Sequence, residues 1–103
     1  MPTAERRRHM RFELQFPIET IRIGDETLSL RGVTQNVSSR GVLFSSPSPI
    51  AVGQIVEFSM DLSNGLGTGV NLRCAGSVLR SEMRDTGRCT VAATIERHAY
   101  FRL

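Results

Sequence analysis

The amino-acid sequence predicts an all-β domain built as an antiparallel β-barrel or sandwich. Three observations point to this fold class. Apolar residues alternate with polar ones over several short segments, turn-forming residues separate these segments, and no stretch has the spacing of an amphipathic helix. The chain has 103 residues, the size of one domain. A closed barrel also removes the sheet edges that a small open sheet would have to protect.

The expected strands follow one another with short turns between them. In the first strand the apolar phase changes between Ile18 and Ile21, which predicts a bulge or bend after Pro17. The later strands alternate regularly, and the glycine-rich segment 63–69 is expected to be a loop between two of them. The last residues, 98–103, fit either a strand extension or one helical turn. The expected strands are residues 12–23, 27–36, 42–46, 55–62, 70–81 and 89–95.

Positive charge is concentrated at the N-terminus. The chain has 13 basic residues, all of them arginine, and 10 acidic residues, so its net charge is +3. Residues 1–11 hold four arginines against one glutamate, and this segment therefore accounts for the whole surplus. We expect residues 1–11 to form a flexible basic arm and residues 12–103 to form the barrel domain.

The sequence offers little material for catalysis or metal binding. His9 lies within the arginine run and His98 has no acidic or cysteine partner at a familiar spacing, so both are expected to be solvated. Nucleophile, phosphate-loop and metal-ligand motifs are missing from the sequence, and Cys74 and Cys89 are expected to be reduced, packed thiols. We expect a protein that is not an enzyme and uses no cofactor or metal. With no signal peptide and no apolar run of roughly 18–20 residues, it is expected to be cytoplasmic.

Two short motifs carry the functional information. Arg7-x-x-x-Arg11 precedes the first strand, and Asn36-x-Ser38-x-x-Gly41 lies between the second and third strands. Each alone has an ordinary explanation. The first fits a solvated arm, and the second fits a turn in which Asn and Ser bond to the local backbone and Gly supplies a positive φ. Their occurrence together, in this order and in a small all-β domain, is much less expected by chance.

With both motifs complete, the sequence resembles the PilZ domain family over nearly the whole chain. The resemblance implies a six-stranded antiparallel β-barrel of the split-barrel type with a flexible basic N-terminal arm. It also implies a receptor for the bacterial second messenger cyclic di-GMP. Many members of the family add a C-terminal helix over one barrel mouth, and the residues after the last expected strand are too few for a long one. That mouth is then covered by a partner protein, by a second copy in a homodimer, or by nothing.

The resemblance further implies the residues that bind the ligand. Arg7 and Arg11 would bind a phosphate or a guanine edge, for which the planar guanidinium is well suited. Asn36 and Ser38 would make polar contacts with a guanine or its phosphate, and Gly41 would keep the turn free of a Cβ. In the family, a basic residue at the position of Arg6 accommodates a stacked pair of ligand molecules. The arm would close over the ligand, and its ordering would signal to a downstream protein that the sequence does not name.

Two alternatives from other functional classes stay open. One is a protein–protein adaptor of the same fold that binds no nucleotide, although the complete motifs argue against it. The other is a small nucleic-acid-binding barrel, which a pI near 9.7 suggests. Proteins that bind single-stranded nucleic acid stack the bases on exposed aromatic side chains. This chain has five Phe, one Tyr and no Trp, and most of the Phe are at strand positions expected to face the core. We therefore expect neither nucleic-acid binding nor membrane insertion.

Overall fold

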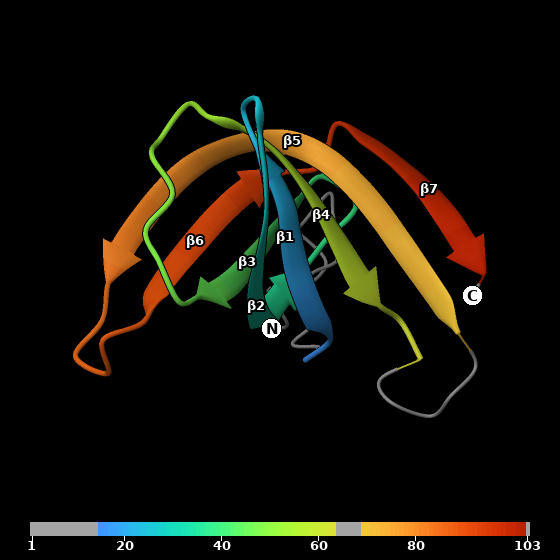
Figure 1. Ribbon diagram of the computed structural model, residues 1–103. Helices are drawn as coiled ribbons and strands as arrows, with labels where there is room; N and C mark the ends of the chain where they lie inside the picture. Colours follow the sequence, from blue (N-terminus) through green and yellow to red (C-terminus); the bar gives the residue numbers. More distant parts are fainter. Residues whose placement is uncertain (1–14, 64–68, 103) are drawn as a thin grey trace, which may run out of the picture.

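The protein forms an antiparallel barrel of six strands with a seventh strand beside it (Figure 1). The computed structural model describes residues 15–63 and 69–102, and it contains no helix in these ranges. The predicted six-stranded antiparallel barrel is therefore confirmed, while the predicted arm of residues 1–11 lies outside the described residues. The strands are β1 Pro17–Ile23, β2 Glu26–Val37, β3 Gly41–Ser46, β4 Ile55–Asp61, β5 Val70–Met83, β6 Cys89–Thr94 and β7 Arg97–Arg102.

The barrel closes because each of its six strands pairs with two neighbours. The order around the sheet is β4-β1-β2-β3-β6-β5, and the pairing of β4 with β5 completes the ring. The longest strand, β5, arches over the barrel in Figure 1 and changes partners along its length. Residues 71–77 pair with β4, residues 70–75 also pair with β7, and residues 78–83 pair with β6. This change of partner allows one strand to close the barrel.

The inward-facing side chains fill the barrel interior. The predicted alternation in β4 is confirmed, because Val56, Phe58 and Met60 are fully buried. The rings of Phe44 and Phe58 lie with their centroids 5.9 Å apart, within the range of favourable aromatic pairs. The buried apolar core consists of Ile18, Val42, Phe44, Ile50, Val56, Phe58, Met60, Cys74, Val78, Cys89, Val91 and Ala93.

Three strands contain a register shift, and each shift changes which face the following side chains occupy. The shift in β1 falls between Thr20 and Arg22, next to the change of phase that the sequence predicts. Those in β2, between Thr34 and Asn36, and in β5, after Val78, were not predicted. A β-bulge of this kind re-aims side chains and increases the local twist. Both of these latter shifts lie beside the candidate site.

The C-terminal segment, which the sequence left open between strand and helix, is the strand β7. It pairs with residues 70–75 of β5 and forms one flank of the molecule in Figure 1. The strand can form because β6 occupies only the second half of this edge of β5, so the first half is free for β7. In the described ranges, β7 pairs with β5 alone.

The structure also bears on the two cysteines and on the connections between the later strands. Cys74 and Cys89 are free and buried, as expected. A turn at 84–88 connects β5 to β6, with Gly87 at a φ of 86°. Most of the expected loop at 63–69 lies outside the described residues. Within those residues, the chain has no helix of the length and apolarity needed to cross a bilayer.

Candidate functional site

A pocket opens on the outer wall of the barrel, where β2, β3, β6 and β5 lie next to one another. Its volume is about 250 Å³, and its lining includes Asn36, Ser38 and Gly41. The second motif is therefore gathered at one place. The other lining residues are Val37, Arg40, Val42, Leu43, Leu79, Arg80, Ala92 and Ala93.

Ser38 holds the turn between β2 and β3 in shape. Its backbone N–H donates to the carbonyl of Gly41 at 2.9 Å. Its Oγ accepts hydrogen bonds from the backbone N–H groups of Arg40, at 3.3 Å, and of Gly41, at 3.2 Å. The hydroxyl also lies within donating distance, 3.3 Å, of the Gly41 carbonyl. Ser38 thus fixes the position of the backbone that forms one rim of the pocket, as the structural explanation of the motif predicts.

The side chain of Asn36, unlike that of Ser38, does not take part in the turn. Its side chain is half-buried and lines the pocket, yet it forms no hydrogen bond in the part of the chain that the structure describes. The ordinary explanation, in which Asn36 bonds to the local backbone, therefore does not apply to this residue. The register shift after Thr34 explains its placement, because Thr34 faces the core and Asn36, two residues on, faces outward. An amide with free donors and acceptor at a pocket wall is suited to binding a ligand.

Gly41 is needed for space and not for its φ. The described glycines with positive φ are Gly24, Gly53, Gly69 and Gly87, so the ordinary explanation, in which Gly41 supplies a positive φ, does not apply. Gly41 begins β3 and lies against β6, where a Cβ would come within 3.1 Å of the carbonyl oxygen of Ala93. A glycine lets the two backbones approach closely beneath the pocket.

The charged residues in the described lining of this pocket are all positive. Arg40 and Arg80 line it, and no Asp or Glu is among its described lining residues. Both arginines are exposed, and within the described ranges their guanidinium groups form no hydrogen bond or ion pair. Two other pockets, of about 350 and 320 Å³, are larger but contain carboxylates beside arginines. The pocket at the motif is therefore the one of these three that is suited to an anion.

The comparison with protein families agrees with the fold and with the position of the motif. The sequence matches the model of the PilZ domain over residues 5–99, which is most of the chain. The chain belongs to the PilZ family. PilZ domains are binding domains, generally for cyclic di-GMP, that act together with effector proteins. No curated protein matches the chain.

The PilZ match begins ahead of the arginine segment, so it includes both halves of the family signature. Of the predicted site residues, the structure brings together Asn36, Ser38 and Gly41. The predicted residues Arg6, Arg7 and Arg11 lie outside the described residues, and their assignment stays a prediction.

Two residues that line this PilZ pocket were not singled out from the sequence. Arg40 lies inside the second motif, at a position where the motif accepts any residue, so its charge was the only available signal. Arg80 lies on β5, far from the motif in sequence, and no signal in the chain shows that the two meet. Their proximity depends on β3 and β6 lying between β2 and β5.

Proposed function

We propose that this protein is a receptor for cyclic di-GMP that binds the ligand between its N-terminal arginines and the pocket at Asn36, Ser38 and Gly41. One observation carries the proposal. The polar residues of the family motif line a pocket whose described lining also contains no carboxylate and two arginines that are unpaired among the described residues. Cyclic di-GMP offers two phosphates and two guanines, which match this set of donors.

The distribution of charge supports a role for the arm. Outside residues 1–11 the chain carries nine arginines and nine acidic residues, so the barrel has no net charge of its own. Two arginines at the pocket attract a dianion only modestly when they are exposed to solvent. Arg7 and Arg11 would add two further planar donors that can bind phosphate or guanine bidentately. Arg6 would provide a third when a second ligand molecule stacks on the first.

The signal would be carried by the arm. Binding would draw residues 1–11 onto the barrel wall, since the ligand neutralises their mutual repulsion, and would create a new surface for a downstream protein. The protein would act in the bacterial cytoplasm as a binding module and not as an enzyme. The pocket suits this role, because its described lining has no histidine, cysteine or carboxylate that could act as a general base.

Calorimetric titration with cyclic di-GMP tests the proposal. We expect saturable binding that is tighter than for the linear dinucleotide pGpG or for GTP and that weakens as salt is added. Arg7→Ala and Arg11→Ala should each weaken binding by about 1.5–3 kcal/mol, the value of a charge-assisted hydrogen bond.

Arg8→Ala is the matched control, since it removes the same charge from the same segment but is not part of the motif. It should weaken binding much less than the two motif variants. Equal affinity for GTP, or no heat at high micromolar cyclic di-GMP, would contradict the proposal. The latter result would favour the adaptor alternative.

A further inference from the structure

Arg80 lies at the opposite end of the pocket from Asn36, in the same row of paired residues. The strand registers connect them, because Asn36 is opposite Leu43, Leu43 is opposite Ala92, and Ala92 is opposite Arg80. The row crosses β2, β3, β6 and β5, which is about 14 Å between the two outer strands. This row therefore has one polar residue at each end and two apolar residues between them.

A bulge in β5 directs Arg80 to the outside. Val78 is opposite Ala93 and faces the core, and Arg80 is opposite Ala92, the next residue of β6. The extra residue, Leu79, is 56% exposed, and Arg80 is also exposed. Two consecutive residues of one strand thus point outward at the pocket. The shift in β2 does the same for Asn36, so both ends of the row are set by bulges, which are common beside binding sites.

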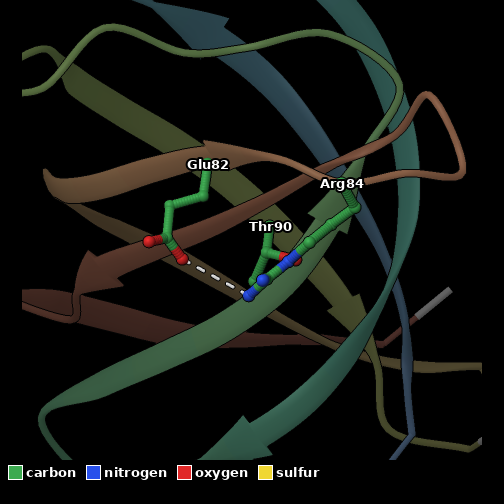
Figure 2. Close-up of polar contacts among 3 residues, drawn as sticks. All are labelled: Glu82, Arg84 and Thr90. Carbon is green, nitrogen blue, oxygen red and sulfur yellow. Dashed lines mark hydrogen bonds and ion pairs between the residues drawn. The ribbon is translucent and has the colours of Figure 1, made fainter.

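Among the described residues, the guanidinium group of Arg80 has no carboxylate partner, and the nearest acid on its strand is paired with another arginine. Glu82, two residues along β5, accepts a hydrogen bond at 3.3 Å from Nη2 of Arg84 (Figure 2). Nε of Arg84 donates to Oγ1 of Thr90 at 2.8 Å, which fixes the Arg84 side chain over β6. Arg80 therefore keeps its donors free for a molecule that enters the pocket.

We infer that Arg80 is a further ligand-binding residue, whose guanidinium binds the O6/N7 edge of a guanine lying over Leu43 and Ala92. This inference rests on the proposed function. The apolar side chains between Asn36 and Arg80 suit the flat face of a base better than a phosphate, which would require donors there. An arginine at the end of such a floor meets the edge of the base, and bidentate pairing with O6 and N7 is the geometry that a guanidinium favours.

The test compares variants of the full chain by calorimetry with cyclic di-GMP. Arg80→Ala should weaken binding about 10- to 100-fold without lowering the midpoint of thermal unfolding, and Arg80→Lys should restore part of the loss. Arg31→Ala is the matched control, since it removes an exposed arginine that lines a different pocket, and it should change the affinity less than twofold. A 7-deazaguanine analogue of cyclic di-GMP, which lacks N7, should lose more affinity for the wild type than for Arg80→Ala.

The outcomes separate this inference from the proposed function. If the wild type binds cyclic di-GMP and Arg80→Ala binds it equally well, the inference is wrong and the receptor function stands. If Arg31→Ala and Arg80→Ala weaken binding equally, only the overall charge matters and the inference is again wrong. Equal losses for the 7-deaza analogue in both proteins would overturn the base contact. A wild type that does not bind cyclic di-GMP overturns both proposals.

Discussion

Replacing Gly76 with alanine should be among the most damaging single substitutions in the barrel. Gly76 lies in β5, at the point where this strand changes from pairing with β4 to pairing with β6. A Cβ at this position would lie 1.8 Å from the carbonyl oxygen of Thr94, and ordinary contact begins at 3.4 Å. The two backbones would therefore have to separate by about 1.6 Å. This would strain the hydrogen bond from the Ser77 N–H to Oγ1 of Thr94, which is 2.8 Å long.

The expected loss of stability in Gly76→Ala is about 3–5 kcal/mol. Overpacking costs about 1–3 kcal/mol. Two hydrogen bonds would also be weakened, the one at Ser77 and the nearby one from the Glu96 N–H to the Ala75 carbonyl. Each weakened bond lowers stability by about 1 kcal/mol. For a domain of this size the midpoint of thermal unfolding should fall by about 15–30 °C. Urea unfolding followed by far-ultraviolet circular dichroism measures the change, since the chain has no tryptophan.

Gly53→Ala provides the control for this substitution. No atom lies within 4 Å of a Cβ at Gly53, but its φ of 90° disfavours alanine. It should therefore lose about 1–2 kcal/mol from backbone strain alone. A Gly76→Ala variant that is no less stable than Gly53→Ala would refute the reasoning, because the clash would then have been relieved without cost.

Two further predictions concern stability. Thr20→Val should leave stability unchanged or raise it by about 1 kcal/mol in urea unfolding, because Oγ1 of Thr20 is buried without a hydrogen-bond partner in the described structure. Thr34→Val should lower it by about 1–2 kcal/mol, because Oγ1 of Thr34 accepts the Phe16 N–H at 2.8 Å; the opposite order would contradict both. Burial raises the pKa of the Cys74 thiol from 9.0 to about 11, so the folded state retains a proton that the unfolded state releases between these values. The contribution of this thiol to stability should therefore be constant below pH 9 and decrease as the pH rises toward 11. Urea midpoints measured from pH 8 to 11 should show this decrease in the wild type, and Cys74→Ala should remove it.

The strands could be predicted because each one alternates between core and solvent. Val56, Phe58 and Met60 show this clearly, since every second side chain of β4 is buried. The segment of β7 is too short for alternation to distinguish a strand from a helical turn, and it forms a strand because one half of β5 has a free edge. That free edge is a property of the assembled sheet, and residues 97–102 alone contain no information about it.

The site was predictable only where its residues are close together in the sequence. Asn36, Ser38 and Gly41 could be found because one turn brings them together. Arg80 reaches the same pocket through the pairings of β2 with β3, β3 with β6 and β6 with β5, and through a bulge that shifts its phase. The ordinary explanation of Gly41 by a positive φ fails for a similar reason, because the constraint on space comes from Ala93 on a neighbouring strand and not from the turn.

The two-residue period of the strands separates stability from binding in this protein. Val56 and Phe58 are fully buried in the core and are not part of the pocket lining, whereas Leu43 and Ala92 are partly buried and line the pocket. A core substitution can therefore change stability with little effect on the outer wall, and Arg80→Ala can change binding without disturbing the core. The exception is the start of β3, where Gly41 is paired with Thr94, the residue that a Cβ at Gly76 would displace. Because this pairing supports the rim of the pocket, Gly76→Ala should weaken ligand binding as well as folding, although Gly76 itself does not line the pocket.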